Sequence, residues 1–358
     1  MSLELEPRPL RCLGRVVSAI GAGCWTIGGP ATNRGIPIGW DGVDPDRAYE
    51  GLARAYALGV TLFDTADVYG LGASERLLGR LLTSVPRNQV VISSKVGYFA
   101  GTAAHPYHPL QMRHQLETTL TNLGSDYLDM YFLHSSDFGL DDRYLDDAVE
   151  QMRAFQREGL ISAIGMRAPH VFAQERNDAS TQRFLRLFNQ IRPGVLTVRY
   201  NLLSPLYSAD ETDIFDFAKK QEVDVIIKQP LAQGLLTGTH SPDRPRRTSS
   251  SDHRSTDPTF TQHIVQAVHE VLREVVQHFG DQPADLVRVA LRYALQRAPD
   301  APVLVGFRDA GQITMSLTSL GDPLAGDAIA LLRHLTAPAR QMIHDLPARV
   351  PQSRPASA

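Results

Sequence analysis

Four polar residues suited to acid–base chemistry stand at or just after the ends of three successive apolar segments. Asp64 and Tyr69 lie in FDTADVYG, Lys95 in VVISSKVG and His134 in MYFLHS. A phenol titrates near about pH 10 and is a poor donor at neutral pH, but a nearby ammonium lowers its pKa. A carboxylate keeps that ammonium charged, and an imidazole hydrogen-bonds a substrate oxygen. Together these groups suit protonation of a carbonyl oxygen as hydride reaches its carbon, or the reverse oxidation.

Each of these residues, taken alone, has a more ordinary structural explanation. A lysine at a strand end usually extends to solvent, an aspartate usually caps a helix, and a tyrosine usually packs in the core. Their combination is informative because the carboxyl ends of parallel strands meet at one face of a barrel. The sequence therefore predicts one site with Asp64, Tyr69, Lys95 and His134 around a common mouth.

The elements that must position these residues alternate between short β-branched runs and longer amphipathic segments. Helices are predicted within 72–82, 109–124, 144–159, 212–221 and 283–298, and strands within 16–25, 59–66, 89–97, 126–135, 162–168, 194–203, 224–231 and 302–307. This alternation requires parallel strands joined by helical crossovers. The predicted fold is an α/β (β/α)₈ barrel. An open doubly wound sheet is the alternative, but GCWTIGGP follows the first strand in place of a GxGxxG turn.

The chain is expected to form a single barrel domain over residues 1–348, followed by a disordered tail over 349–358. One segment, residues 239–262, interrupts the pattern and is rich in Ser, Thr, Arg, Asp and Pro. It is long for a connection between a strand and a helix, so we expect a flexible loop that is either disordered or a mobile lid.

Composition narrows the classes of function. The 358 residues are 43% hydrophobic and carry a net charge of −3, which gives no basic field for a nucleic acid or an anionic membrane. Cys12 and Cys24 are the two cysteines, so a disulfide scaffold is not expected. The first residues carry charges rather than an apolar run, and no stretch approaches the roughly 20 apolar residues of a membrane span. A cytoplasmic protein is expected, and the sequence gives no prediction of its oligomeric state.

The same segments resemble the aldo-keto reductase family. FDTADVYG followed by SE and LLG, then SSKVG, then YLDMYFLH carry the likeness, which extends from near Ile20 to near Val305. The resemblance implies that Tyr69 is the general acid and base, that Lys95 and Asp64 tune it, and that His134 orients the carbonyl. It also implies a small-molecule carbonyl substrate and a nicotinamide cofactor, usually NADPH, bound without a Rossmann fold.

The residues expected on the cofactor side match the family only in part. Met166 and Arg167 stand where the family usually has Ser-Asn, Thr197 where it has Gln, and Lys228 where an aromatic often stacks on nicotinamide. Neither Met166 nor Arg167 can reproduce the donors and acceptors that it replaces. The adenosine side keeps more of the family pattern, in Gly306, Arg308 and Gln312, with Ser316 where Asn is common. Gly23 and Trp25, at the end of the first strand, complete the expected cofactor site.

Three interpretations remain open from these residues. The first is an NADPH-dependent reductase in which Arg167 and Lys228 contact the amide, ribose or diphosphate of the cofactor. The second is a barrel that uses Tyr69 and Lys95 for dehydration, epimerisation or cyclisation, and the third is a non-catalytic regulatory subunit. No metal is expected, because the neighbouring histidines His105 and His108 lack acidic or cysteine partners at ligand spacing. An aromatic entrance formed by Trp25, Trp40, Tyr98 and Tyr107 is expected.

Overall fold

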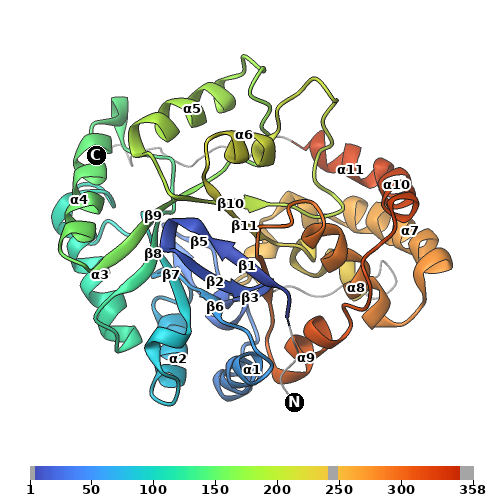
Figure 1. Cartoon of the computed structure of the whole chain (residues 1–358), viewed down its shortest axis with the longest axis horizontal. Helices are drawn as coiled ribbons and strands as arrows, with labels where there is room; N and C mark the ends of the chain where they lie inside the picture. The colour runs from blue at the N-terminus through green and yellow to red at the C-terminus, as the bar shows by residue number, and fades with distance from the viewer. Residues whose placement is uncertain (1–4, 241–248, 347–358) are drawn as a thin grey trace.

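A closed barrel of eight parallel strands forms the centre of the computed structural model, which describes residues 5–240 and 249–346 (Figure 1). Each strand hydrogen-bonds its sequence neighbour in the barrel, and the last pairs in parallel with the first, so no sheet edge is left open. The predicted (β/α)₈ barrel is confirmed. Its strands are β3 (Ile20–Gly23), β6 (Leu62–Asp64), β7 (Val91–Val96), β8 (Leu128–Leu133), β9 (Ile161–Arg167), β10 (Val195–Arg199), β11 (Asp224–Lys228) and β12 (Val303–Gly306).

Helices surround the barrel and begin and end at local sequence signals. Asp44 accepts hydrogen bonds from the N–H groups of residues 46 and 47, and Pro45 opens the first helix. The helix α3 ends at Gly124, whose φ of +60° favours glycine. The helices are α1 (Pro45–Ala57), α2 (Ala73–Leu82), α3 (Pro109–Leu123), α4 (Leu145–Arg157), α5 (Ala179–Ile191), α6 (Ile214–Lys220), α7 (Gln262–Phe279), α8 (Pro283–Leu295), α9 (Ala310–Thr318), α10 (Gly326–Leu335) and α11 (Ala337–His344).

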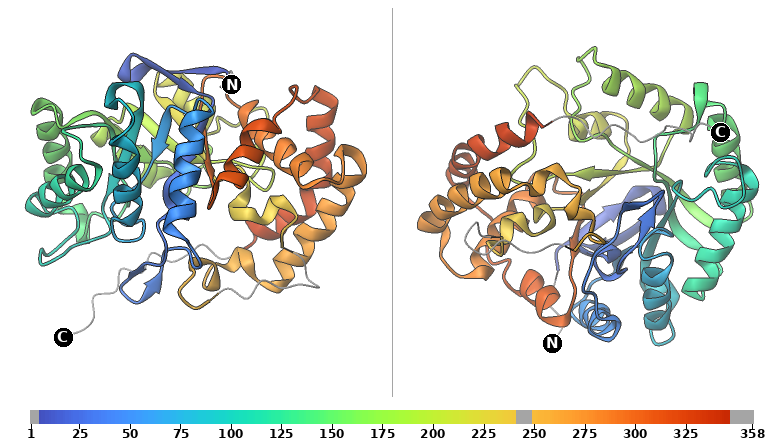
Figure 2. Two further views of the ribbon diagram at one scale, coloured as in Figure 1. Left: turned by 90° about the horizontal axis from the view of Figure 1, so that it is seen from below. Right: turned by 180° about the vertical axis from the view of Figure 1, so that it is seen from behind.

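The amino-terminal end of the barrel is closed by a hairpin that the sequence did not reveal. Its strands are β1 (Pro7–Leu10) and β2 (Arg15–Ser18), which pair antiparallel across one end of the molecule (Figure 2, left). Leu10 and Val17 of this hairpin pack against the side chains that fill the barrel. The prediction of one strand over 16–25 is therefore wrong: the chain turns at Ala19, leaves the hairpin and only then enters β3.

Inside the barrel, inward-facing side chains of alternate residues pack closely. They include Leu62, Val91, Phe132 and Leu304. A methyl group on Gly21 would lie 2.8 Å from Leu304 Cδ2, so a larger residue at this position of β3 would crowd the interior. The interior is thus filled, and the reactive residues must lie above it at the carboxyl ends of the strands.

The opposite end of the molecule carries a short hairpin, β4 (Thr32–Asn33) and β5 (Ile36–Pro37), together with residues 249–262, which we name the strap (Figure 2, left). The strap belongs to the segment expected to be a flexible loop, yet it contains two short 3₁₀ helices and buries Asp252, His253 and Arg254. Asp252 and Arg254 bind each other, and Asp252 also binds the N–H of Asp41, which follows β5. Residues 241–248, the domain boundary at 348 and the expected tail 349–358 lie outside the described residues.

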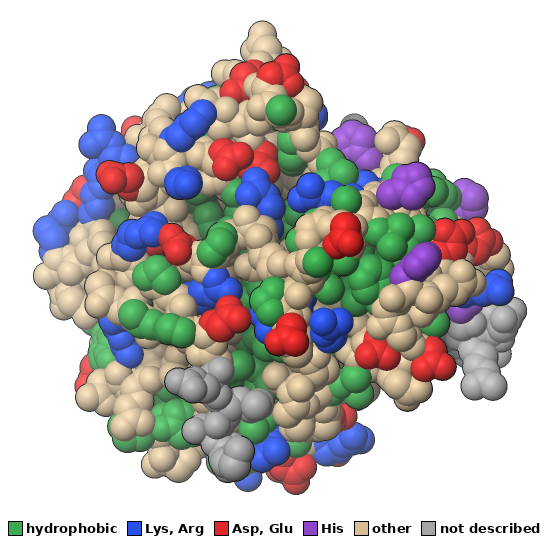
Figure 3. All heavy atoms as spheres, turned by 45° about the vertical axis from the view of Figure 1, so that its right-hand side comes forward, with side chains coloured by type: hydrophobic (Ala, Val, Ile, Leu, Met, Phe, Trp, Pro, Cys, Tyr) green, Lys and Arg blue, Asp and Glu red, His purple; other side chains and the backbone are tan. Residues whose placement is uncertain are grey.

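The outer surface mixes both signs of charge. On the face that Figure 3 shows, acidic and basic side chains are interspersed, with histidines on the side of α7, α10 and α11. This pattern fits the small net charge of −3. In the part of the chain that the structure describes, no helix has the length and apolar character needed to cross a membrane.

Candidate active site

The tetrad predicted from the sequence comes together at the carboxyl end of the barrel. Asp64 ends β6, Lys95 is the penultimate residue of β7, and His134 directly follows β8. Alternation along the strands turns these three side chains inward, and Tyr69 follows β6 in the loop before α2. The Tyr69 and His134 rings are 6.1 Å apart between centroids and nearly perpendicular, at 80°.

A buried ion pair anchors this group. Lys95 Nζ donates to Asp64 Oδ2 at 2.7 Å and to the carbonyl oxygen of Thr65 at 2.5 Å, and Ser93 Oγ donates to Asp64 Oδ1 at 2.6 Å. Burial alone would lower the pKa of Lys95, but Asp64 and Tyr69 outweigh burial and raise it. Lys95 is therefore held as an ammonium in a fixed position.

Tyr69 lies against this ammonium, with Lys95 Nζ 4.7 Å from the centroid of its ring. Burial raises the pKa of the Tyr69 phenol, the charge of Lys95 lowers it and Asp64 raises it, and the result is a pKa of about 12. The ammonium lowers the pKa as expected from the sequence, but burial is the larger effect. Tyr69 is consequently a protonated O–H donor at neutral pH.

His134 lies between two tyrosine rings. The ring of Tyr98 meets its edge at 4.7 Å between centroids and 86°. Burial, followed by the charges of Lys95, Arg167 and Lys228, lowers the pKa of His134 well below its ordinary range. The imidazole is therefore neutral at pH 7 and suited to hydrogen bonding a substrate oxygen.

All of the residues expected in the site line one cavity of about 1930 Å³, including those proposed for the cofactor: Gly23, Trp25, Met166, Arg167, Thr197, Lys228, Gly306, Arg308, Gln312 and Ser316. Drug-sized ligands usually occupy roughly 300–1,000 Å³, so this cavity has room for a larger ligand or for two ligands. Trp25, Trp40 and Tyr98 line it as expected. Tyr107 does not belong to the entrance: it is fully buried and its hydroxyl donates to the carbonyl oxygen of Ser135 at 2.7 Å.

The wall of the cavity formed by β9, β10 and β11 is cationic. Arg167, Arg199 and Lys228, which we name the cation wall, all line the cavity at the ends of these strands. In the sheet, Thr197 pairs with Arg167, and Arg199 pairs with Lys228. Met166, by contrast, packs in the layer between strands and helices and is only 4% exposed.

The far end of the cavity is built at the start of α9. Gln312 Oε1 accepts from the N–H of Arg308 at 3.1 Å, and Ser316 Oγ donates to the carbonyl oxygen of Gln312 at 3.0 Å. The guanidinium of Arg308 lies 5.3 Å from the ring centroid of Trp40 and 4.0 Å from a carboxylate oxygen of Asp252. This cation is placed where it can meet a phosphate that enters the cavity.

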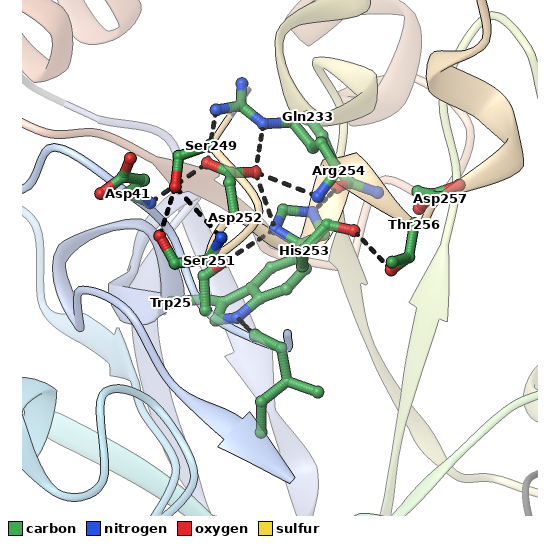
Figure 4. Close-up of polar contacts among 12 residues, drawn as sticks. Trp25, Asp41, Gln233, Ser249, Ser251, Asp252, His253, Arg254, Thr256 and Asp257 are labelled. Carbon is green, nitrogen blue, oxygen red and sulfur yellow. Dashed lines mark hydrogen bonds and ion pairs between the residues drawn. The ribbon is translucent and has the colours of Figure 1, made fainter. Parts of the chain in front are cut away.

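The strap contacts both Arg308, at the far end of the cavity, and Trp25 of the aromatic entrance (Figure 4). His253 lies between the two indoles, 4.4 Å from Trp25 and 4.5 Å from Trp40 between ring centroids. The His253 N–H donates to the carbonyl oxygen of Gly39 at 2.9 Å, and its Nε2 hydrogen-bonds Gln233. Because these bonds fix the strap over the cavity, the strap forms part of the wall.

Asp252 holds the strap internally. Its carboxylate accepts from Arg254 Nη2 at 2.7 Å and from the N–H of Asp41 at 3.1 Å. Burial raises the pKa of Asp252, but the hydrogen bonds and charge of Arg254 outweigh burial and hold the pKa well below its ordinary range. Asp252 is therefore ionised and bound to Arg254.

Some of these residues were missed in the sequence. Ser93 and Arg199 follow from strand alternation, because each lies two residues from a recognised inward-facing position, Lys95 and Thr197 respectively. No comparable signal marks Asp252 or His253, because the bonds that place them at the cavity, to Asp41 and Gly39 respectively, join segments far apart in the chain. Within residues 5–240 and 249–346, no group of three or more His, Cys, Asp or Glu side chains is placed to bind a metal.

The cavity fits a nicotinamide dinucleotide in part. Gly23 and Gly306 are paired positions on β3 and β12, and both line the cavity. A methyl group on Gly306 would lie 2.9 Å from Thr26 Cγ2. Arg308 supplies a cation at the far end, whereas the cation wall replaces the neutral groups expected around the nicotinamide.

A parallel barrel with tyrosine, lysine, aspartate and histidine at its carboxyl mouth defines a class of oxidoreductases that act on carbonyl and alcohol groups without a Rossmann fold. The model of the Aldo/keto reductase family matches residues 19–337, and the chain belongs to this family. It is accordingly an NAD(P)H-dependent oxidoreductase.

Known relatives agree with this assignment. The chain is 25% identical over 341 residues to the "NADH-specific methylglyoxal reductase" of Escherichia coli, covering 91% of this chain and 97% of that protein. Among solved structures, a glycerol dehydrogenase from Gluconobacter oxydans matches with a TM-score of 0.70 and 23% identity, covering 98% and 99% of the two chains. An aldo-keto reductase from Klebsiella pneumoniae in complex with NADPH matches with a TM-score of 0.62 and 22% identity, covering 92% and 95%.

Proposed function

We propose that this protein reduces the carbonyl group of a small metabolite to an alcohol with NADPH, and that Tyr69 is its general acid. The observation that carries the proposal is the arrangement of Tyr69 against the Lys95–Asp64 pair, with His134 beside it. Four groups of the types that carbonyl reduction needs meet at one place in the cavity. A binding or regulatory protein does not require this combination.

In the proposed mechanism, the bound cofactor supplies a hydride to the carbonyl carbon. His134, which is neutral, hydrogen-bonds the carbonyl oxygen and orients it. Tyr69 donates its proton to that oxygen as negative charge develops on it, and Lys95 stabilises the phenolate that remains. Asp64 keeps Lys95 charged and in place, and solvent later returns a proton to Tyr69.

The preference for NADPH over NADH rests on Arg308. Its guanidinium lines the far end of the cavity, and guanidinium groups bind phosphate dianions through charge-assisted, often bidentate hydrogen bonds. NADP(H) differs from NAD(H) by one phosphate on the adenosine ribose. The E. coli relative is named as NADH-specific, so this preference has to be measured for this chain.

The cation wall supports a preference for the reduced cofactor. Positive charge near the oxidised nicotinamide, which is a cation, disfavours it by Coulomb repulsion, whereas the reduced ring is neutral. The proposed direction in the cell is therefore reduction. We also propose a cytoplasmic location, on the basis of two cysteines that are both free thiols.

The test is a titration with NADPH, NADP⁺ and NADH by fluorescence or calorimetry, followed by a screen of aldehydes and ketones. Tighter binding of NADPH than of the other two, together with carbonyl-dependent NADPH oxidation, is the expected result. If neither redox form binds at millimolar concentration, hydride transfer is excluded, and dehydration and isomerisation assays would follow.

A further inference from the structure

Arg167 and Lys228 of the cation wall differ from the other described cations of the cavity. Five cationic side chains that line the cavity have a carboxylate partner: Lys95 with Asp64, Arg176 with Glu211, Arg183 with Asp142, and both Arg254 and Arg308 with Asp252. Arg34, on the turn of the β4–β5 hairpin, is exposed to solvent. The lining cations that do not belong to the cation wall are thus either paired with a carboxylate or exposed to solvent.

The charges of Arg167 and Lys228 are neither paired with a described acid nor exposed to solvent as that of Arg34 is. Both are partly buried. The guanidinium of Arg167 bonds the hydroxyl of Tyr98 at 3.5 Å and Nε2 of His170 at 3.2 Å. Within residues 5–240 and 249–346, neither Arg167 nor Lys228 forms an ion pair with an acid.

The acids that line the cavity are bound by other groups in the described part of the chain. Asp64 is bound by Lys95 at 2.7 Å. Asp137, Asp178 and Asp257 each accept a hydrogen bond from a backbone N–H group of their own segment. Among the described residues, none of these acids neutralises Arg167 or Lys228, which leaves both side chains able to bind an anionic ligand.

The lowered pKa of Lys228 also favours an anionic ligand at this place. Burial lowers the pKa of Lys228 well below its ordinary range, and the charges of Arg167, Lys95 and Arg199 lower it further, while Asp64 raises it. A negative group bound among these cations would relieve their mutual repulsion. Burying cations without such a partner is costly, and positions of this kind often serve function.

We propose that Arg167 and Lys228 bind a carboxylate that is part of the carbonyl substrate, so that the substrates are aldehydes or ketones that carry an acid group. This inference rests on the reductase activity proposed above and names its substrate class. The planar guanidinium of Arg167 suits a carboxylate through paired hydrogen bonds, and Lys228 adds a point charge. Reduction converts the carbonyl into CH–OH by addition of one hydride and one proton, and the carboxylate is unchanged.

The position of these cations favours the substrate over the diphosphate of the cofactor as the source of the anion. Arg167 contacts Tyr98, and Tyr98 packs on the edge of the His134 ring at 4.7 Å. Arg167 and Lys228 are also close enough to His134 to lower its pKa. Arg167 is therefore separated from the imidazole that receives the carbonyl oxygen by the ring of Tyr98.

Substrate pairs test the proposal. We would measure kcat/KM with NADPH for glyoxylate, succinic semialdehyde and para-carboxybenzaldehyde, each against its neutral methyl ester. At least one acid should be preferred, and Arg167→Gln and Lys228→Gln should each lower its kcat/KM by about 10- to 100-fold, the effect of one charge-assisted hydrogen bond. The ester should change little, Lys228→Arg should retain the preference, and Arg34→Gln should behave like the wild type.

Binding of an inert anion separates this proposal from the reductase activity. Calorimetry would measure the affinity of malonate for the whole protein, alone and saturated with NADPH, in the wild type and in the same variants. Malonate should bind in both states and weaken by a similar factor in Arg167→Gln and Lys228→Gln, with unchanged circular dichroism.

Two outcomes would overturn the proposal. If NADPH saturation abolishes malonate binding and the variants lose NADPH affinity instead, the cations hold the cofactor diphosphate. If acids and esters are reduced equally well, the cations do not select the substrate. Malonate binding that depends on Arg167 and Lys228 in a protein that reduces no carbonyl compound would preserve the anion site and refute the reductase.

Discussion

The two walls of the cavity solve the problem of buried charge in opposite ways. On the wall built from β6, β7 and β8, Lys95 and Asp64 neutralise each other at 2.7 Å, and Ser93 binds the second carboxylate oxygen. On the cation wall, built from β9, β10 and β11, no acid of the described chain forms an ion pair with Arg167 or Lys228. The first wall is complete without a ligand, whereas the second wall is suited to receiving one.

This difference separates chemistry from selection. A proton donor must be held in one protonation state and one position, which the ion pair beside Tyr69 achieves. A binding group gains affinity when its charge is compensated only on binding, because the cost of burying it is then recovered from the ligand. The two walls should accordingly respond differently to substitution.

Tyr69→Phe should give the largest loss of activity. Removal of a single general acid lowers the rate by about 10²–10⁴-fold, while the fold and NADPH affinity should change little. Steady-state kinetics on the best substrate measures the effect. Tyr131→Phe is the matched control, because Tyr131 is fully buried away from the cavity. Wild-type turnover in Tyr69→Phe would rule out Tyr69 as the acid.

Lys95→Met should remove activity and also destabilise the protein. It leaves Asp64 buried without its cation, a change that costs about 3–5 kcal/mol in free energy of unfolding. The double variant Lys95→Met with Asp64→Asn should recover much of that stability but no activity. Urea denaturation combined with activity assays separates the two effects. A single variant as stable as the wild type would show that the pair is not tightly coupled.

Arg308→Ala should weaken NADPH binding by roughly tenfold or more, the effect of losing a charge-assisted hydrogen bond, with a much smaller loss for NADH. Fluorescence titration with both cofactors gives the two dissociation constants. Arg47→Ala removes a neighbouring cation that pairs with Asp309 outside the cavity and serves as the control. Equal losses for NADPH and NADH would show that Arg308 does not recognise the phosphate.

Lys228→Met should give the smallest change in the free energy of unfolding. This change should be a gain, whereas Lys95→Met should give a loss. Lys228 is partly buried and forms no ion pair with any acid of the described segments, so its removal should raise the free energy of unfolding by about 1 kcal/mol near pH 7. The pKa of Lys228 is lowered in the folded state, so below about pH 10.4 the unfolded chain binds more protons than the folded chain. Lys228 therefore lowers the stability of the wild type near pH 7. This loss disappears as the pH rises toward about 10.4.

The gain from Lys228→Met should therefore shrink between pH 7 and pH 10. Thermal unfolding of the wild type and the variant across this range measures the difference, with Lys219→Met on the exposed surface of α6 as control. Destabilisation at pH 7 would mean that Lys228 already has a compensating partner in the folded protein, and the contrast between the two walls would fail.

The sequence predicted the tetrad because strand ends carry a local signal. Asp64, Lys95 and His134 each close an apolar run, and parallel strands of a closed barrel bring such ends to one mouth. Arg199 was accessible by the same rule of alternation but was not recognised. The strap was expected to be flexible because its composition is polar, a property that does not show that Asp252 and Arg254 bind each other at 2.7 Å.

The sequence by itself determined the barrel, the tetrad and the presence of cations where neutral groups are usual, since these depend on periodicity and residue type. Tertiary structure decided the rest. The pKa of Tyr69 rises to about 12 because burial exceeds the effect of Lys95, and only packing sets that balance. Within the described residues, the lack of an ion-pairing acid beside Arg167 and Lys228 likewise depends on contacts between distant strands, because a charge is neutralised by what lies near it in space and not by what precedes it in the chain.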